Sequence, residues 1–496
     1  MHESRDRVVA LLRSLVVLGA GNYGAMAVSL GINALLTRRL GPETFGHLTL
    51  LLMASQVMLM LVANWTQAGI IRFGAQEFST TGSVAETFWT RVWIVAPWAA
   101  LGAAAMVAAH GPLADYLSIP AWGLAIVSLH FVASFVLLSA GAAFQARNEM
   151  SRYGATLFFD KATLALLLLL PLGVVSSPLT LLGMYAASSV TVAVWALTRL
   201  GRRSLLPIVF DGAAYRRMLI FSIPLIVSSW VGLLGTNWID FMVIKRYRPI
   251  SEIGLYALGV LLAGVVQQVT IVFSTLLLPQ LSVMVARGEY DRIRTVADRV
   301  LPYWLLATSV LFSVVLIGAR VIVPLVFGAG FARSATILAL LMPAAAALAL
   351  FSAFAPLVIA LGSTWVLTGI YLASGVVNVG LDLLLIPTYG IEGSAVATTL
   401  SYATSAVMVL LFAGARLNGR LYPLAWMTLP VVVVLICFLW LDGPSFYVVA
   451  LLAGALAVYG LMRRFQLFRG EDAVFFESLR LSAPLLPGMS LVARRR

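Results

Sequence analysis

The sequence predicts an all-α protein that crosses a lipid bilayer about fourteen times. Three observations support this fold class. Of the 496 residues 61% are hydrophobic and only 11% are charged, whereas soluble domains carry roughly 25% charged residues. Uncharged stretches long enough for a helical crossing, which needs about 20 residues, follow one another along the chain. The breaks between them are short and rich in charge, Pro or Gly, so we expect no separate soluble domain.

The apolar segments give the expected crossings in order. They lie near residues 14–37, 46–66, 89–109, 119–143, 154–174, 178–198, 217–244, 254–278, 301–323, 334–360, 364–386, 392–414, 421–441 and 444–462. One boundary needs a physical reason, because the 37 residues from Ala162 to Thr198 carry no charge. As one helix they would span about 55 Å at 1.5 Å per residue. Pro171, Gly173 and Pro178 divide this stretch into two helices.

The distribution of basic residues predicts the orientation. With the N-terminus inside the cell, 26 of the 33 Lys and Arg residues fall on the cytoplasmic side, Arg72 and Arg91 among them. Only seven fall outside. Basic residues concentrate on the cytoplasmic side of membrane proteins, so we predict that both termini are cytoplasmic. The same rule explains the net charge of +13 without nucleic acid as a partner.

An internal repeat predicts two lobes. Residues 36–48 (LTRRLGPETFGHL) follow the first helix, and residues 243–255 (VIKRYRPISEIGL) follow the seventh with a similar basic, Pro and Gly pattern. Parallel repeats of this kind form two halves around a central cavity. The predicted domains are an N-terminal six-helix lobe, a C-terminal six-helix lobe, two additional helices and a basic cytoplasmic tail, at residues 1–205, 206–415, 416–465 and 466–496.

Four segments resemble the polysaccharide (O-antigen type) flippase family of the multidrug/oligosaccharidyl-lipid/polysaccharide exporter superfamily. They are LTRRLGPETFG (36–46), NWIDFMVIKRYRPISEIGLY (237–256), LVFGAGFARSATILALLM (325–342) and NVGLDLLLIPTYGIEGSAVATTLSY (378–402). The matches follow the family's order over essentially the whole chain. One departure is Asp382, where the family pattern has Asn.

The resemblance implies a function. It implies alternating-access movement of a polyprenyl-diphosphate-linked oligosaccharide across the bacterial or archaeal cytoplasmic membrane, for polysaccharide export as in lipopolysaccharide synthesis. Glycan polymerase machinery is an implied partner beside membrane lipid. A multidrug or cation antiporter, a peptidoglycan-precursor flippase and, less favoured, a membrane glycan polymerase stay open as alternatives. The oligomeric state does not follow from the sequence.

The cargo implied by the resemblance carries a diphosphate, which Arg binds with paired hydrogen bonds. The first lobe carries cations near its cytoplasmic end where the second has neutral residues, such as Gln280 in the repeat position of Arg72. The candidate substrate-binding residues are therefore Arg72, Arg147, Arg152, Lys161 and Gln67. The alternative is that these cations only set the topology and contact lipid headgroups.

Charges of both signs lie near the expected outer ends of the helices. We expect them to pair between the lobes and to close the outside, as contacts that differ between two states would. The candidate outer-gate residues are Arg38, Arg39, Asp240, Lys245, Arg246 and Asp382. Ion pairs within a single lobe, which help packing only, are the alternative.

Catalytic and metal-binding motifs are not found in the sequence. It has neither a phosphate-binding Gly-rich loop with Lys, nor a His-Glu-x-x-His motif, and its one cysteine is Cys437. We therefore expect a transporter without enzyme activity, metal site or cofactor. The energy source would be an ion gradient, with proton or sodium as the possible coupling ion, the membrane potential, or consumption of the product outside.

Overall fold

The chain is almost entirely helical. The computed structural model describes residues 2–169, 177–234, 237–419 and 421–467, and these contain no β-strand. In the first part of the chain the elements are α1 (His2–Val62), η1 (Asn64–Thr66), α2 (Gln67–Thr81), α3 (Ala85–Ala108), α4 (His110–Leu117), α5 (Gly123–Ala146), α6 (Met150–Leu169), α7 (Pro178–Leu200) and η2 (Arg202–Ser204). The predicted all-α class is confirmed.

The second part of the chain continues in the same way. Its elements are α8 (Gly212–Leu234), α9 (Asn237–Tyr247), α10 (Ile250–Ala286), α11 (Tyr290–Thr295), η3 (Val296–Val300), α12 (Leu301–Phe327), η4 (Ala329–Phe331), α13 (Arg333–Ala360), α14 (Thr364–Tyr389), α15 (Ile391–Leu417), η5 (Tyr422–Thr428), α16 (Leu429–Trp440) and α17 (Gly443–Arg464). Of the predicted basic tail, residues 468–496 lie outside the described residues.

Eleven helices of the described ranges are long and apolar enough to cross a membrane. The expected crossings 14–37 and 46–66 are joined within α1 at Gly41, whose φ of 69° and ψ of 174° are not helical. The expected crossing 217–244 is divided into α8 and α9, and neither these nor α6, which carries charged residues, is among the eleven. The protein is thus a multi-pass membrane protein with the expected succession of helices.

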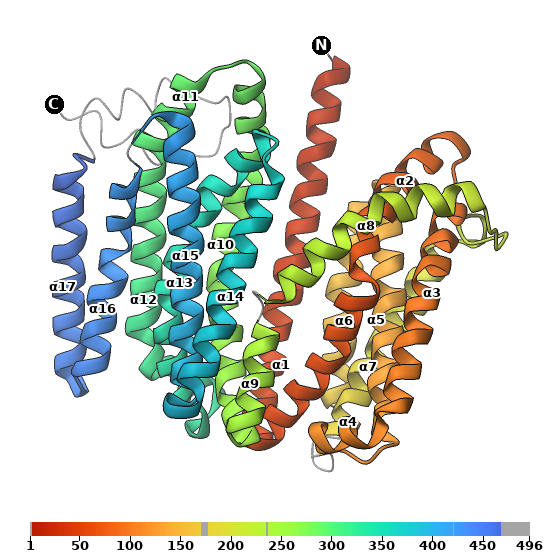
Figure 1. The fold of residues 1–496 in the computed structure, drawn as a ribbon, viewed down its shortest axis with the longest axis horizontal. Coiled ribbons are helices and arrows are strands. Elements are labelled where there is room, and N and C mark those ends of the chain that lie inside the picture. Colours follow the sequence, from red (N-terminus) through yellow and green to blue (C-terminus); the bar gives the residue numbers. More distant parts are fainter. Residues whose placement is uncertain (1, 170–176, 235–236, 420, 468–496) are drawn as a thin grey trace.

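The helices form two groups that stand side by side (Figure 1). One group contains α2–α7, and the other contains α9, α10 and α12–α15. The first half of α1 stands between them and packs against α6, where Gly21 meets the backbone of Gly154. Helix α8, which follows α7 in the chain, packs against α2, α3 and η1 and also against α14. The domain boundaries at residues 205 and 415 stay predictions.

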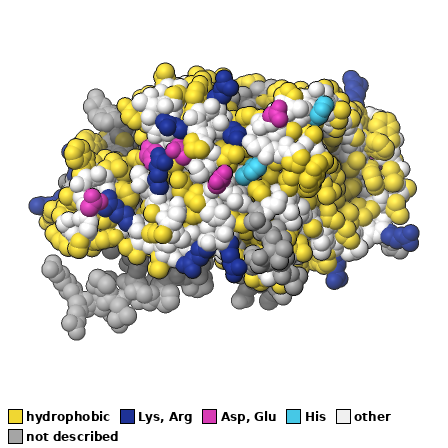
Figure 2. Space-filling model, turned by 90° about the horizontal axis from the view of Figure 1, so that it is seen from below, with side chains coloured by type: hydrophobic (Ala, Val, Ile, Leu, Met, Phe, Trp, Pro, Cys, Tyr) yellow, Lys and Arg dark blue, Asp and Glu magenta, His cyan; other side chains and the backbone are white. Residues whose placement is uncertain are grey.

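The two ends of the molecule differ in their contacts. The free ends of α1 and α17 lie at the upper end in Figure 1, and the chain turns at Gly41 at the lower end. Figure 2 shows the lower end, where acidic and basic side chains lie next to one another among apolar ones. Which end faces the cytoplasm stays a prediction.

At the lower end, α1 and α10 meet backbone to backbone. A Cβ atom on Gly46 would lie 2.7 Å from the amide nitrogen of Gly254, and one on Gly254 would lie 2.9 Å from that of Gly46. Both would also clash with carbonyl oxygens, of Ile250 and Pro42 respectively. Only glycine permits such an approach, so these two positions determine how closely the two helices pack.

Neighbouring side chains extend this contact toward η4 and α12. The rings of Phe45 and Phe331 pack edge to face with centroids 5.6 Å apart. Arg38 of α1 donates hydrogen bonds to the carbonyl oxygens of Leu325 and Val326 at the end of α12. Because cations near a helix C-terminus interact favourably with its dipole, Arg38 holds the end of α12 against α1.

The last two helices are attached to the second group through Arg320 of α12. Its guanidinium lies 2.8 Å from a carboxylate oxygen of Asp442 and donates to the carbonyl oxygen of Phe438. It also stacks over the rings of Phe438 and Phe446, at 4.4 and 4.7 Å from their centroids. This docking places α16 and α17 at the outer edge of the molecule (Figure 1).

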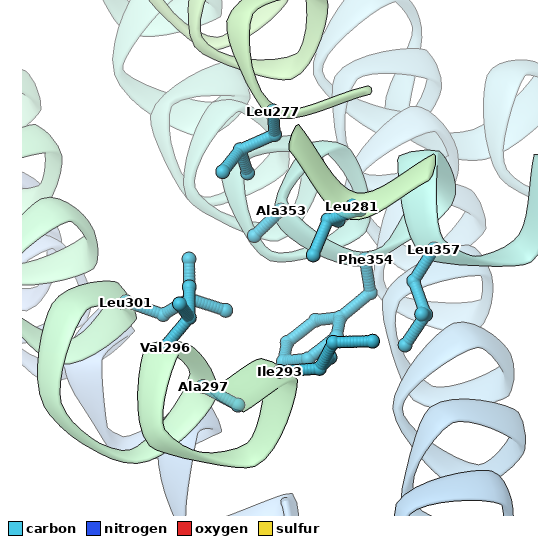
Figure 3. Close-up of a pocket in the computed structure, with 9 residues that line it drawn as sticks. All are labelled: Leu277, Leu281, Ile293, Val296, Ala297, Leu301, Ala353, Phe354 and Leu357. Atoms are coloured by element: carbon cyan, nitrogen blue, oxygen red, sulfur yellow. The ribbon is translucent and has the colours of Figure 1, made fainter. Parts of the chain in front are cut away.

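A small apolar void lies inside the second group (Figure 3). It is bounded by Leu277 and Leu281 of α10, by the π-helical turn Val296–Val300 and by Phe354 of α13. Its volume of about 10 Å³ is at the lower limit for one water molecule. We interpret it as a packing defect beside the irregular turn.

Replacing Gly254 by Ala should destabilise the protein. The added methyl group forces α1 and α10 apart, and overpacking of this kind costs about 1–3 kcal/mol. We expect a lower thermal unfolding temperature of the detergent-purified protein. Gly264→Ala on the same helix is the control, because its Cβ meets nothing within 4 Å and Ala favours a helix. Equal unfolding temperatures of the two variants would contradict the close contact.

Candidate functional site

A buried polar cluster surrounds Asp240 in the second group of helices. Asp240 lies on α9 and is only 1% exposed. Its carboxylate accepts hydrogen bonds from the Tyr256 hydroxyl at 2.6 Å, from the Asn378 amide at 2.8 Å and from the Thr398 hydroxyl at 3.2 Å. The partners come from α10, α14 and α15, so the cluster joins four helices.

Asp382 completes this cluster with a second carboxyl group. It follows Asn378 by one turn of α14, is fully buried and accepts a hydrogen bond from the same Asn378 amide at 3.1 Å. Its Oδ1 atom has no hydrogen-bond partner among the described residues, and both carboxyl groups lie within hydrogen-bonding distance of the one Asn378 amide nitrogen. Buried carboxylates repel each other and are costly without compensation. The cluster can therefore hold a proton or a small cation between its oxygen atoms.

The structure corrects the predicted pairing of Asp240 and Asp382. We expected them to pair with cations of the first lobe across the outer end. Instead both point into the second group, where Asn378, Tyr256 and Thr398 surround Asp240. The physical reason is the rotation of α9 about its axis, which turns Asp240 toward α10 and α14. A role in gating stays a prediction for the basic residues at this end.

Two of those basic residues do bridge helices that are distant in sequence. Arg38 donates to carbonyl oxygens at the end of α12, as described above. Lys245 of α9 donates to the Ser118 hydroxyl at the end of α4, at 3.2 Å. Arg39 and Arg246 lie in exposed positions at the same end. The bridges thus run to hydroxyl and carbonyl groups where the sequence led us to expect carboxylates.

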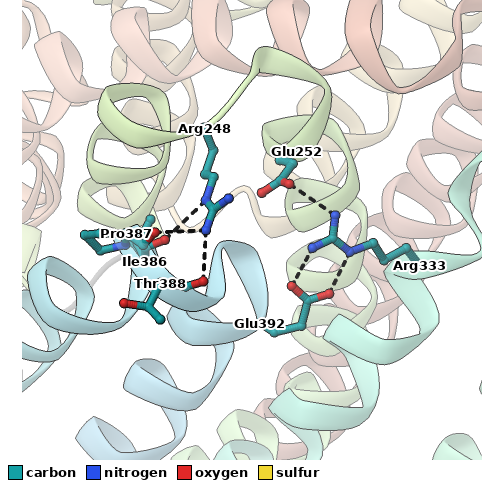
Figure 4. Close-up of polar contacts among 7 residues, drawn as sticks. All are labelled: Arg248, Glu252, Arg333, Ile386, Pro387, Thr388 and Glu392. Atoms are coloured by element: carbon teal, nitrogen blue, oxygen red, sulfur yellow. Dashed lines mark hydrogen bonds and ion pairs between the residues drawn. The ribbon is translucent and has the colours of Figure 1, made fainter.

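An ion cluster that the sequence did not predict closes the lower end of the second group (Figure 4). Arg333 of α13 donates to both carboxylate oxygens of Glu392, at 2.7 and 2.6 Å, and to Glu252 at 3.2 Å. The nearby Arg248 donates to the carbonyl oxygens of residues 386–388 at the end of α14. Glu252 and Glu392 lie in the first turns of α10 and α15, where negative charge is favourable. The cluster therefore joins the ends of α10, α13 and α15.

Most cations predicted to bind substrate have local partners. Arg147 forms an ion pair with Glu149 at 2.6 Å and donates to the carbonyl oxygen of Leu200 at 2.9 Å. Arg152 pairs with the same Glu149 at 2.8 Å. Lys161 pairs with Asp160, also at 2.8 Å. The three residues thus join neighbouring segments of the first group, and their part in substrate binding stays a prediction.

Arg72 is different. It is exposed on α2, and no carboxylate lies within ion-pair distance of it among the residues that the structure describes. Its guanidinium lies over the rings of Phe221 and Phe73, at 4.8 and 5.5 Å from the centroids. Arg217 of α8 lies over Phe73 from its own side, at 5.2 Å. Where α2 and α8 meet, the guanidinium groups of Arg72 and Arg217 thus both lie over aromatic rings. Gln67, at the start of α2, is half-buried.

Arg91 was counted in the sequence only for topology, but the structure buries it completely in the first group. Its Nε atom donates to the Thr66 hydroxyl at 3.0 Å, and its guanidinium lies 5.2 Å from the ring centroid of Phe135. Neither of its terminal nitrogens has a hydrogen-bond partner in the described ranges of the chain. Charged residues inside membranes are costly and usually functional. The signal in the sequence was a lone charge within the expected crossing 89–109.

Comparison with protein families places the chain. A family model described as polysaccharide biosynthesis protein matches residues 11–285, more than half of the chain. The chain belongs to this family. A Haloferax volcanii protein, described as the probable low-salt glycan biosynthesis flippase Agl15, is 26% identical over 223 residues. The match covers 45% of this chain and 46% of that protein, so the chain matches about half the length of this curated relative.

Solved structures show where the fold recurs. The lipid II flippase MurJ, in an inward closed conformation, superposes with a TM-score of 0.69 at 13% identity and covers 94% of this chain and 99% of that one. An inward-facing multidrug resistance MATE family transporter of the MOP superfamily gives a TM-score of 0.63 at 10% identity. It covers 83% of this chain and 99% of the other. At these identities the likeness concerns the fold alone.

Replacing Arg91 by Met should leave the fold intact and stabilise it. Met fills a similar volume without a buried charge, and apolar replacements of buried ions are often stabilising by about 1–4 kcal/mol. Thr66 keeps a partner, since its hydroxyl also donates to the carbonyl oxygen of Ala63. We expect an equal or higher thermal unfolding temperature of the purified variant. A large decrease would mean that Arg91 is a structural residue.

Proposed function

We propose that this protein is a flippase that moves a polyprenyl-diphosphate-linked oligosaccharide across the cytoplasmic membrane by alternating access. The observation that carries the proposal is that two cations of the first group, Arg72 and Arg91, have no carboxylate partner among the residues that the structure describes. A diphosphate is the kind of anion that guanidinium groups bind with paired, charge-assisted hydrogen bonds. The family of the chain and the printed function of its Haloferax relative support a glycan-linked cargo.

The contacts at the lower end support alternating access. The Gly46–Gly254 contact closes the lower end, and a path to that side requires α1 and α10 to separate. The Arg333 cluster keeps α10, α13 and α15 together, so the second group can move as a unit. Rigid-body movement of one group against the other is a common form of such transport. With the N-terminus in the cytoplasm, the lower end is the outside.

A second candidate cargo is a peptidoglycan precursor. The superposition on a lipid II flippase favours it, but only through the fold. A polyprenyl diphosphate group is common to both candidates, so the arginines do not separate them. An organic-cation antiporter is disfavoured, because Asp160 in the first group is already paired with Lys161 and with the Ser189 hydroxyl. Export of O-antigen as the biological role, with polymerase machinery as partner, is part of the proposal.

The second group supplies a site for a coupling ion. Asp240 and Asp382 share the Asn378 amide in a buried cluster, and the Thr398 and Tyr256 hydroxyls add oxygen atoms. Sodium binds to oxygen ligands of this kind, and a proton shared by two carboxyl groups would relieve the same repulsion. We propose that this cluster binds the coupling ion. It lies apart from the cations of the first group, so cargo and ion would bind in different lobes.

Transport should depend on Arg72 and Arg91 and not on Arg152. In proteoliposomes with a fluorescent polyprenyl-diphosphate oligosaccharide, Arg72→Gln and Arg91→Met should each lower the flipping rate at least about tenfold. Hydrogen bonds to charged groups contribute about 1.5–3 kcal/mol, and 1.4 kcal/mol is a factor of ten. Arg152→Gln is the matched control, because Glu149 already occupies that arginine.

The same vesicles distinguish the candidate cargoes. A polyprenyl-diphosphate muropeptide that moves faster than the oligosaccharide would support the precursor flippase. Movement of an organic cation dye, without movement of either lipid, would refute the proposal. Wild-type rates in both arginine variants would refute the role of the cations while leaving the cargo open.

Sodium or acid should stabilise the wild-type protein through the Asp240–Asp382 cluster. A ligand that binds only the folded state raises stability by about 2.7 kcal/mol at one hundred times its Kd. We expect the thermal unfolding temperature to rise with sodium chloride but not potassium chloride if sodium is the ion, and with falling pH if it is the proton. Asp382→Asn should remove the dependence, since one carboxyl group then has a neutral neighbour. The same dependence in this variant would exclude the cluster as the ion site.

A further inference from the structure

A groove opens on the second group, at the upper end of α15 (Figure 1). It encloses about 470 Å³ between the last turns of α15 and the connection to η5. Its walls are apolar, with Val407, Leu411, Ala415, Leu421 and Ala425 among the lining residues. Val407 and Leu411 are more than half exposed. The groove is therefore an apolar channel that faces the surrounding lipid.

Basic residues surround the upper end of this groove. Arg416 follows the lining residue Ala415 and is exposed in the last turn of α15. Arg463 and Arg464 are exposed in the last turn of α17, which ends at the same level. Arg464 lies 5.8 Å from the ring of Trp426, the neighbour of the lining residue Ala425. None of these three arginines has a carboxylate partner among the contacts of the described chain.

The combination is typical of a lipid headgroup region. Tryptophan concentrates at the level of the headgroups in membrane proteins, and Trp426 is half exposed. Basic pockets between membrane helices bind anionic headgroups. Here cations and an exposed indole lie at the upper end, and an apolar channel runs away from them along α15. This order of polar and apolar groups matches the order in a phospholipid.

We propose that this groove binds an anionic phospholipid, with its phosphate at Arg416 and Arg464 and an acyl chain between α15 and η5. A zwitterionic phospholipid would also fill the groove, but its ammonium group would bring a positive charge close to the arginines together with the phosphate. The cargo proposed above would bind where the two groups of helices face each other, whereas the groove is lined by the last turns of α15 and the connection to η5 within the second group. The inference therefore does not depend on the proposed function.

Binding can be measured by native mass spectrometry of the delipidated protein in mild detergent. We titrate it with phosphatidylglycerol and, separately, with phosphatidylcholine of the same acyl chains. The wild-type protein should retain phosphatidylglycerol preferentially. Each basic residue near an anionic lipid surface contributes about 1 kcal/mol, so Arg416→Gln with Arg464→Gln should weaken phosphatidylglycerol binding about thirtyfold. Ala415→Phe, which fills the groove from an exposed position, should weaken both lipids.

Arg199→Gln is the matched control. Arg199 is also exposed in the last turn of a helix, and it lies 6.0 Å from the ring of Trp195, but it belongs to α7 of the first group and not to the elements that line the groove. It should leave binding unchanged. Equal retention of the two lipids by the wild type, or unchanged preference in the double variant, would overturn the proposal. Loss of preference in Arg199→Gln would show nonspecific attraction and overturn it as well. Unchanged unfolding temperatures confirm that the variants are folded.

Discussion

The backbone contact between α1 and α10 at the lower end determines how the two groups of helices stand. At Gly46 and at Gly254 the backbone of the other helix occupies the space that a side chain would need. The Phe45–Phe331 and Arg38 contacts lie beside these two glycines. Because this contact joins segments about two hundred residues apart, it connects the first crossings of the chain to the second group. A change of access between the two sides of the membrane would have to begin there.

The charges within the apolar helices are divided between the two groups. The first contains guanidinium groups for which the described part of the chain supplies no carboxylate partner, while the second buries Asp240 and Asp382 around one Asn378 amide. Such groups are costly in a membrane and are retained where they have a function. The division agrees with a transporter in which an anionic cargo and a small cation bind at separate places. The Arg333 and Arg320 contacts, in contrast, join helices within the second group and its edge.

Sequence reasoning was most successful for the helices and least for the partners of charges. It identified Arg72, which the structure leaves without a carboxylate, but it grouped Arg147, Arg152 and Lys161 with it. Those three have Glu149 or Asp160 beside them. It also overlooked Arg91, because a single basic residue near a helix end looks like a topology signal. The burial of Arg91 depends on the contact between α3 and the turn η1, where Arg91 donates to the Thr66 hydroxyl.

The sequence by itself determined that this is a multi-pass helical membrane protein, because hydropathy and helix length are properties of contiguous residues. It also indicated the family, through motifs that lie within single segments. Only the tertiary structure decided where each charge points. Asp240 is directed away from the first lobe, and Gly254 meets Gly46, because rotation of each helix about its axis is set by neighbours distant in the chain. A periodic pattern shows which residues share a face but not which helix that face meets.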